Sequence, residues 1–368
     1  MPEAIAEQVR PIYKHDHLNP TRRGWLFMGR HGGPCDKACK MCYYAFQDTL
    51  VFYDLDTLIS HANRFRHYYG LEFCDISGGE PTIYGPKKDG RRPKLEELIT
   101  HCASIGLKPT IITHGQNNTA ELVAGVEAAG LEDWLISLHG MEEGHEQTVV
   151  NHQGKGDGGY QRLIDGLQHI TRPVRFNTTV QNFNYTELPS LARWLSDNRP
   201  PTVWNMILFN PFFKWNERPE IDFQEKQSEL APWIGNAVAI AEAAGWEVNV
   251  RYFSPCIAAQ YGFEKNCVGF FQTQIDPWEW SLVATNNTPL SFTEQLPNAH
   301  AMNMAHCRQI SDSRSNPTCE QCRFFKTVCE GPQSQYQKRY GLDEFTPSIG
   351  EHVNDPAYFE RGGTFYGD

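Results

Sequence analysis

Residues 29–46 read GRHGGPCDKACKMCYYAF and place Cys35, Cys39 and Cys42 in the spacing C-x3-C-x2-C. The stretch follows a short apolar run at residues 25–28 that predicts a β-strand, so the cysteines stand on the loop after that strand. Three thiolates can bind three irons of a [4Fe–4S] cube and leave the fourth iron open to another ligand. The spacing therefore predicts an iron–sulfur cluster with an open site.

Zinc is the alternative occupant of this loop. A structural zinc site needs four ligands in a closed tetrahedron. No fourth cysteine lies nearby in the sequence, and His31 is the side chain that could complete such a set. The open-site cluster is the first interpretation and zinc the second.

Six apolar runs alternate with segments of helical periodicity from about residue 24 to residue 252. Several of the helical segments end at a glycine, which a helix C-terminus prefers. Six strand–helix repeats require right-handed crossovers and a parallel sheet that curls on itself. The predicted fold class is α/β, a partial (β/α)6 TIM-like barrel with a small cysteine-rich C-terminal domain. The six strands are expected at residues 25–28, 72–76, 110–113, 134–138, 174–180 and 203–209.

The chain is expected to divide into four parts. Residues 1–23 are an N-terminal extension and 24–253 the partial barrel, which ends with a helix at 224–244 and a strand at 247–252. Residues 254–332 lose regular periodicity and are rich in cysteine and aromatic residues, which predicts a domain supported by a cluster. Residues 333–368 form a polar and aromatic tail that we expect to pack back on the core.

A second motif, DISGGEPTIYG, ends the second predicted strand. Its two glycines let the backbone approach a ligand closely, and the carboxylate that follows can meet an ammonium group. With both motifs in place, the chain resembles the radical S-adenosylmethionine (radical SAM) superfamily. The resemblance implies that the open iron chelates S-adenosylmethionine, that a C–S bond is then cleaved, and that the resulting 5′-deoxyadenosyl radical abstracts a hydrogen from a substrate. It also implies that Gly78, Gly79, Glu80 and Pro81 hold the methionine amino end.

The resemblance carries over to further residues at strand ends, where parallel sheets collect their ligands. Met41 matches the family's preference for a hydrophobic residue before the third cysteine. Thr113, Ser137, Asn177 and Asn210 stand where relatives contact the methionine carboxylate, the ribose or the adenine, and strand-end packing is the alternative for each.

His139 and His145 flank a loop that reads HGMEEGH. Ordinary hydrogen-bonded or solvated positions are the first interpretation for both histidines. The glycine run at residues 154–159 follows a polar loop rather than a strand, so it is expected to be a turn and no nucleotide site.

A second set of cysteines follows residue 254 and resembles the SPASM and twitch extensions that add auxiliary [4Fe–4S] clusters to radical enzymes. The resemblance implies one auxiliary cluster, because the cysteine that a two-cluster extension would place shortly after the last one is missing. A zinc knuckle is the alternative. Cys319, Cys322 and Cys329 are the first ligands, with Cys256 or Cys307 as the fourth.

Three more cysteines are set apart from the ligands. Cys267 could donate a hydrogen atom to a substrate radical, with core packing as its alternative. Cys74 and Cys102 lie on predicted apolar faces and are expected to pack.

Composition limits the partners. The chain of 368 residues carries a net charge of −11, which disfavours nucleic acid. No stretch of about 20 apolar residues and no signal core appear, so we expect no membrane contact and a cytoplasmic location. In such a location, the eleven cysteines are expected to be metal ligands rather than disulfides.

One short basic cluster is expected to be a solvated loop, with a phosphate or carboxylate site as the alternative. It consists of Lys87, Lys88, Arg91, Arg92 and Lys94.

The predicted function is hydrogen abstraction from a small metabolite or natural-product precursor, leading to oxidation, epimerisation or rearrangement. Maturation of a ribosomally made peptide is the alternative, and an RNA-modifying or non-catalytic iron–sulfur protein is the second alternative. Because the cysteines begin at residue 35, we expect no separate peptide-recognition or cobalamin domain ahead of them. The family implies a flavodoxin- or ferredoxin-type electron donor as a partner.

Overall fold

The computed structural model describes residues 23–30, 33–42, 51–68, 71–209, 222–268, 317–325, 329, 331–332 and 334–353. Contacts divide them into two compact units, the first ending at Asn177 and the second beginning at Thr178. The boundary falls inside one strand. Of the expected parts, most of residues 1–23, residues 269–316 and residues 354–368 lie outside the described residues.

The main sheet runs in the order β1-β4-β5-β6-β7-β8-β9-β10, and the strand pairs with an assigned register are parallel. A parallel α/β sheet confirms the predicted fold class. Each of the six expected strands is found within about two residues of its predicted ends. The strands of the first unit are β1 (Arg23–Phe27), β4 (Phe73–Ser77), β5 (Lys108–Thr113) and β6 (Asp133–Ser137), with β7 (Val174–Val180) crossing the boundary. A separate antiparallel pair joins β2 (Gly29–Arg30) to β3 (Val51–Phe52) on either side of the cysteines.

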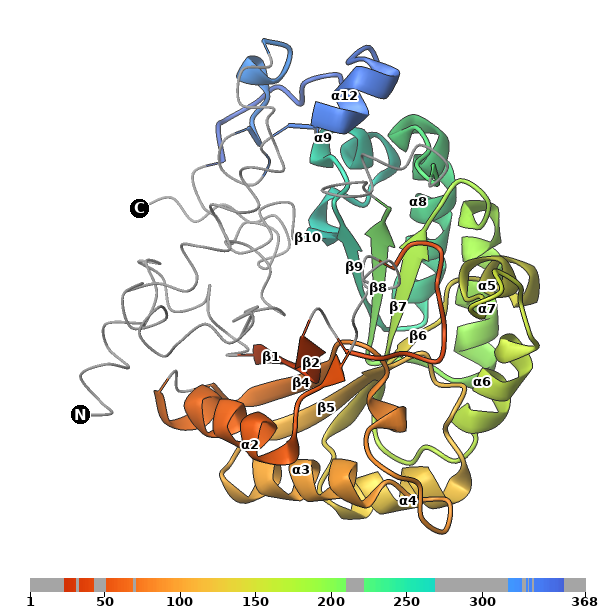
Figure 1. Ribbon diagram of the computed structural model, residues 1–368. Helices are drawn as coiled ribbons and strands as arrows, with labels where there is room; N and C mark the ends of the chain where they lie inside the picture. The colour runs from red at the N-terminus through yellow and green to blue at the C-terminus, as the bar shows by residue number, and fades with distance from the viewer. Residues whose placement is uncertain are drawn as a thin grey trace. The chain divides into compact units, whose positions relative to one another are not determined.

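Helices return the chain between these strands. In Figure 1, α2, α3 and α4 lie along one side of β4 and β5. Asp54 caps α2 by accepting from the N–H of Thr57 at 2.7 Å, and Thr119 caps α4 in the same way. The helices are α2 (Leu55–Asn63), α3 (Pro93–Ser104), α4 (Ala120–Ala128), α5 (Glu142–Thr148) and α6 (Gly159–Leu167), with a 3-10 turn η4 (Pro81–Ile83) after β4.

The helix that begins at Leu55 changes its winding along its length. It is α-helical to Asn63 and continues as a π-helix, η3 (Arg64–Tyr68). Phe65 is buried in the widened turn with its ring beside Gly24, where a Cβ would stand 3.1 Å from it. Helical periodicity in the sequence does not distinguish the two windings over one turn.

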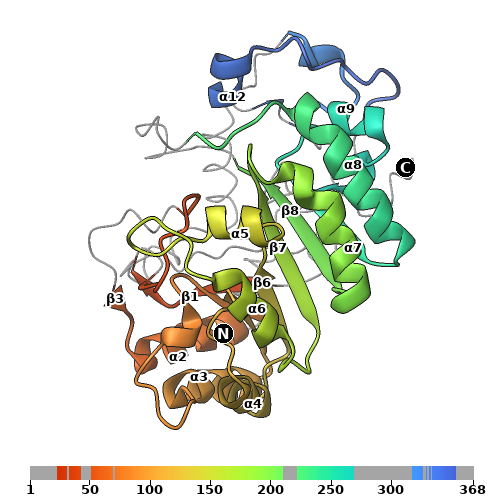
Figure 2. The same cartoon turned by 90° about the vertical axis from the view of Figure 1, so that its right-hand side faces the viewer.

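The second unit contains the rest of the sheet. Figure 2 shows α7 and α8 side by side along β8. Tyr336 of the tail accepts from the N–H of Gln227 at 2.6 Å, and Tyr340 donates to the carbonyl of Gln224 at 2.8 Å, so the described tail packs at the start of α8. The elements are β8 (Val203–Leu208), β9 (Glu247–Arg251), β10 (Cys267–Val268), α7 (Leu188–Asn198), α8 (Gln227–Ala243), α9 (Pro255–Ala258), η9 (Cys319–Gln321) and α12 (Ser334–Tyr340).

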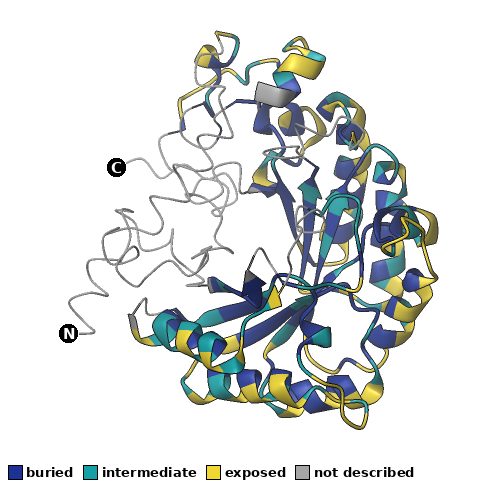
Figure 3. Cartoon of the chain, in the orientation of Figure 1, coloured by how far each residue is buried: buried dark blue, intermediate teal, exposed yellow. Residues whose placement is uncertain are grey.

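The strands are buried along most of their length, and the helices have one buried and one exposed face (Figure 3).

The sheet of the first unit contains a group of charged side chains. Arg175 of β7 donates to Asp133 at 2.6 Å and to Thr110 at 3.1 Å, and lies 3.5 Å from Asp75. Through the described ranges, no helix is long and apolar enough to cross a membrane.

Candidate active site

The cysteine loop (residues 33–42) is tied to its surroundings by backbone hydrogen bonds. On one side, the N–H of Glu80 donates to the carbonyl of Pro34 at 2.8 Å. On the other, Ala38 donates to Val150 at 2.8 Å and Lys40 donates to the carbonyl of Thr148 at 3.1 Å. The loop therefore has no regular secondary structure of its own but is fixed by its neighbours.

Gly79 is required by this close approach. Its φ is +65°, in the left-handed region, and a Cβ there would stand 2.2 Å from the carbonyl oxygen of Pro34 and 2.6 Å from that of Gly33. Gly78 also has a positive φ, +85°. The two glycines of the GGEP motif thus let the β4 end lie directly against the cysteine loop.

The three cysteines of the loop influence one another electrostatically. Burial raises the pKa of the Cys35 thiol, and the charges of Glu80 and Cys39 raise it further. Burial also raises the pKa of Cys39, with Cys42 adding to the effect. None of the described cysteines forms a disulfide. Thiols with raised pKa values need a nearby cation to exist as thiolates, which is the condition that a metal cluster supplies.

Glu80 is buried, with 1% of its surface exposed, and its two oxygens have different partners. Oε1 accepts from the backbone and hydroxyl of Thr82, at 3.0 and 2.6 Å, and from the hydroxyl of Thr113 at 2.6 Å. Oε2 accepts from the backbone N–H of His114 at 3.0 Å. The strand ends of β4 and β5 therefore hold the carboxylate in one orientation.

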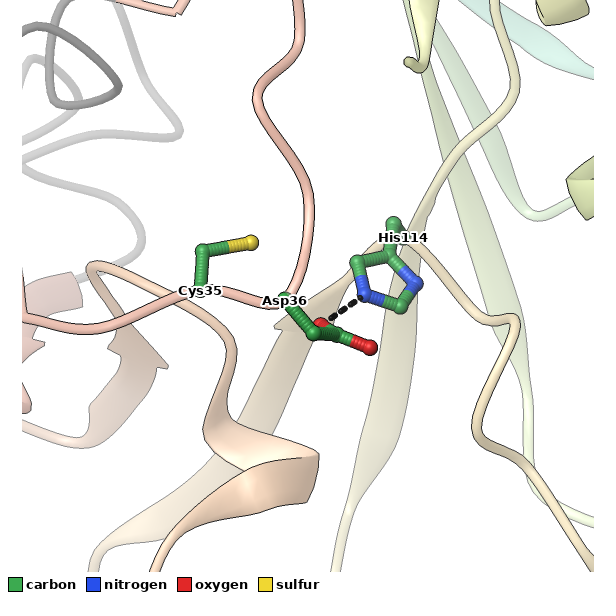
Figure 4. Close-up of side chains that lie close together, drawn as sticks. All are labelled: Cys35, Asp36 and His114. Carbon is green, nitrogen blue, oxygen red and sulfur yellow. Dashed lines mark hydrogen bonds and ion pairs between the residues drawn. The ribbon is translucent and has the colours of Figure 1, made fainter. Parts of the chain in front are cut away.

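His114 joins Glu80 to the cysteine loop, a link that the sequence did not indicate. Its Nδ1 accepts from the N–H of Gln116 at 3.1 Å, so its Nε2 carries the proton and donates to Asp36 at 2.9 Å (Figure 4). Burial lowers the pKa of His114, but the carboxylates of Glu80 and Asp36 raise it more. Sulfur, carboxylate and ring nitrogen of Cys35, Asp36 and His114 lie within 4.8 Å of one another.

Among the other predicted cofactor residues, Thr113 ends β5 and Ser137 ends β6, whereas Asn177 stands in the middle of β7. Ser137 of β6 is opposite Asn177 of β7 in the parallel register, and both are half-buried. Met41 is half-buried on the cysteine loop. The hydroxyl of Thr113 donates to Glu80 and so helps to orient that carboxylate. Asn210 lies outside the described residues.

His139 and His145 are both buried, and their rings stack with centroids 6.1 Å apart. Burial lowers the pKa of His139 to about 3. It also lowers that of His145, with the positive charges of His139, His114 and Lys37 acting in the same direction. Both histidines were expected to be either hydrogen-bonded or solvated, and both lie in the interior.

Two residues of the basic cluster are engaged within the chain. Arg91 forms an ion pair with Glu96, and Arg92 donates to the carbonyl oxygens of Thr82 at 2.9 Å and Gly85 at 2.7 Å. These contacts account for the two arginines as supports of the loop after GGEP.

A second group of four cysteines gathers in the second unit around one pocket, and we call it the second cysteine group: Cys256, Cys319, Cys322 and Cys329. Phe324, Phe325 and Phe345 also line this pocket. Burial raises the pKa of Cys256 to about 12 and that of Cys319 to about 11, with neighbouring thiols adding to both. Burial likewise raises the pKa of Cys329, with the other three cysteines contributing.

The remaining cysteines separate from this group. Cys267 is fully buried in β10, and its sulfur lies 3.7 Å from the carbonyl oxygen of Phe263. Cys74 and Cys102 are fully buried in β4 and α3, where packing was expected. Cys307 lies outside the described residues.

The chain is similar in sequence to several known proteins. The chain is 27% identical over 180 residues to an S-adenosylmethionine-dependent nucleotide dehydratase of a Thermoplasmatales archaeon, covering 46% of this chain and 54% of the relative. It is 31% identical over 85 residues to a PqqA peptide cyclase of Methylocella silvestris, covering 23% of this chain and 21% of the relative. The chain thus spans about half or less of the length of these relatives.

A solved structure of anSMEcpe with bound AdoMet and the Kp18Cys peptide superposes with a TM-score of 0.50 at 14% identity, covering 62% of this chain and 64% of that one. At this identity the likeness concerns the fold. Residues 30–194 match the family model of the radical SAM superfamily, a segment that contains both the cysteine loop and the GGEP motif. The chain therefore carries a radical SAM domain over residues 30–194.

Proposed function

We propose that the chain is a radical SAM enzyme in which Cys35, Cys39 and Cys42 bind a [4Fe–4S] cluster with one open iron. The observation that carries the proposal is the hydrogen bond between Glu80 and Pro34, one residue before Cys35, together with the effect of the Glu80 charge on Cys35 and Cys39. Three thiols on one loop match three irons of such a cluster, and the family uses this cluster together with S-adenosylmethionine.

When bound, the cluster and S-adenosylmethionine supply a carbon-centred radical that removes a hydrogen atom from the substrate. The residues of this chain bind and orient. Thr82 and Thr113 fix Oε1 of Glu80. We propose Oε2, which already accepts from the N–H of His114, as the oxygen that also binds the methionine ammonium. Gly78 and Gly79 keep the backbone close to the cysteine loop. Ser137 and Asn177 are proposed contacts to the rest of S-adenosylmethionine.

We also propose that the second cysteine group binds one auxiliary [4Fe–4S] cluster, with Cys256 as the fourth ligand. The four thiols line one pocket of the second unit, and four thiolates are the ligand set of a [4Fe–4S] cluster. A zinc ion takes four ligands as well, so metal analysis distinguishes the two.

The proposed substrate is a small metabolite or natural-product precursor, in line with the relative that is a nucleotide dehydratase. A peptide is the second candidate, because another relative is a peptide cyclase and anSMEcpe was solved with a peptide. RNA is disfavoured by the net charge of −11. A low-potential flavodoxin or ferredoxin is the proposed electron donor, and the cytoplasm remains the sequence-based prediction of location.

Release of 5′-deoxyadenosine tests the enzymatic proposal. Anaerobically reconstituted protein with dithionite and S-adenosylmethionine is expected to release it, and Cys39→Ala to abolish it. Cys102→Ala is the matched control, because this cysteine is buried in α3 and belongs to neither group, so its loss should leave the release intact. An iron-loaded wild-type protein that releases no 5′-deoxyadenosine would refute the proposal.

Metal analysis tests the second cluster. A triple alanine variant of Cys35, Cys39 and Cys42 is expected to retain about four irons per chain in the second cysteine group. One zinc in their place would contradict the auxiliary cluster without touching the first proposal.

A further inference from the structure

The loop between α5 and α6 (residues 149–158) makes side-chain contacts to the cysteine loop as well as the backbone bonds already given. His152 lies with its Nε2 3.1 Å from the carbonyl oxygen of Cys35. The Nζ of Lys37 donates to both oxygens of Asp157, at 2.8 and 2.6 Å. The glycine run of this loop was expected only to turn, yet it delivers a carboxylate to a residue that stands between the first two cysteines.

The glycines of the run are needed to place that carboxylate. Gly158 has a φ of +76°, and a Cβ on Gly156 would stand 2.5 Å from Oε2 of Glu146. Glu146 in turn accepts from the N–H of Gly158 at 3.1 Å and from that of Tyr160 at 2.6 Å. The turn is thereby fixed from inside, and Asp157 has a defined position.

Lys37 is an unusual cation because only 6% of its surface is exposed. A buried ammonium is costly unless a carboxylate accompanies it, and Asp157 is that carboxylate. Asp157 is shared, since it also accepts from Arg162 at 2.6 Å, and Arg162 continues to Gln116 at 3.0 Å. The buried ammonium between the first two cysteines is therefore paired with an aspartate that is 120 residues away in the chain.

We propose that Lys37 and Asp157 are positioning residues that fix the charge beside the cluster of Cys35, Cys39 and Cys42 and so set its reduction potential. The inference rests on the proposed function, because it needs that cluster. One electron from a low-potential donor adds one negative charge to the cluster. A buried ammonium nearby stabilises the added charge, and the aspartate partly cancels the ammonium. Consistent with this, the charge of Lys37 lowers the pKa of Cys39 against the effect of burial.

Opposite charge changes test the inference. Lys37→Met removes the cation at similar length and is expected to lower the reduction potential, whereas Asp157→Asn leaves the cation uncompensated and is expected to raise it. At a fixed solution potential, the ratio of reduced to oxidised cluster should change at least about threefold in each direction, where tenfold corresponds to about 59 mV. The double variant, with no net change in charge, should return toward wild type.

The readout is the electron paramagnetic resonance signal that changes shape when S-adenosylmethionine is added, because that signal belongs to the open-site cluster. Lys155→Met, which removes an exposed lysine of the same loop, is the control and should leave the ratio unchanged. A purely structural role for the pair predicts lower iron content in both single variants with no opposite shifts in potential.

Two failures are distinguishable. If wild-type protein shows no signal that responds to S-adenosylmethionine, the proposed function fails. If the signal is present but Lys37→Met and Asp157→Asn shift the potential in the same direction or not at all, the charge-setting role is overturned while the proposed function stands.

Discussion

The backbone N–H of Glu80 donates to the carbonyl oxygen of Pro34 at 2.8 Å, one residue before Cys35. The loop after β4 and the start of the cysteine ligands are therefore joined by a main-chain hydrogen bond, which substitutions at these two positions leave in place unless Glu80 becomes proline. Changes of shape at this junction, rather than of charge, are the direct way to test how far the site depends on it.

Gly79→Ala is expected to displace the cysteine loop. The added Cβ would meet the carbonyl oxygen of Pro34 at 2.2 Å, and backbone atoms cannot move aside as a side chain can. We expect the loss of about four irons per chain and of 5′-deoxyadenosine release. Iron content after anaerobic reconstitution is the measurement.

Gly154→Ala is the matched control for this change. Its φ of +75° is also in the left-handed region, but a Cβ there meets nothing within 4 Å. It should cost only about 1 kcal/mol of backbone strain and keep its iron. Equal iron loss in both variants would show that strain, not the close approach, is responsible.

Cys322→Ala is expected to release the auxiliary cluster. The remaining thiols of the second cysteine group lose one of four ligands, so iron should fall by about four per chain while the open-site cluster remains. Cys102→Ala should leave iron unchanged, since that residue only packs in α3. Retention of full iron by Cys322→Ala would mean that another residue, such as Cys307, is the ligand.

Arg175→Met is expected to destabilise the protein strongly. The substitution leaves the carboxylates of Asp133 and Asp75 buried without the guanidinium that accompanies them. Removal of one partner from a buried ion pair costs about 3–5 kcal/mol. Anaerobic urea unfolding measures this, with Arg193→Met at an exposed position as the control. A change below about 1 kcal/mol would argue that the layer tolerates unpaired carboxylates.

Stability is expected to fall as the pH drops below about 6.5 because of His139 and His145. The folded-state pKa of His139, about 3, is below that of an unfolded histidine, so the unfolded chain binds more protons between these values. Its contribution to the free energy of unfolding should decrease by about 2 kcal/mol from pH 7 to pH 5.

Urea unfolding at the two pH values measures the effect of the histidines. His139→Gln should flatten the pH dependence, whereas His169→Gln, at an exposed position, should leave it as in the wild type. An unchanged slope in His139→Gln would assign the acid sensitivity to other groups.

The motifs that could be predicted are those whose residues are contiguous in the chain. C-x3-C-x2-C and GGEP are recognisable because one loop supplies all the ligands or all the backbone contacts. The strand order followed from the alternation of strands and helices, since parallel strands need helical crossovers. By contrast, the partners of Glu80 at His114 and of Lys37 at Asp157 come from separate strand ends and loops. No local pattern marks them.

The fourth ligand of the auxiliary cluster could not be predicted from cysteine spacing either. Cys256 and Cys307 were equivalent by spacing, and it is the position of α9 at the pocket that favours Cys256. The burial of His139 and His145 could not be predicted either, because the sequence HGMEEGH is compatible with both hydrogen-bonded and solvated histidines.

The second cysteine group draws its members from widely separated parts of the chain, with Cys256 preceding Cys319 by about 60 residues. Bringing such distant points together restricts a long loop, at an entropic cost of about 4 kcal/mol. A cluster bound by all four thiols would act as a cross-link that offsets this cost only once iron has arrived. Iron supply would then govern how much of the newly made chain matures.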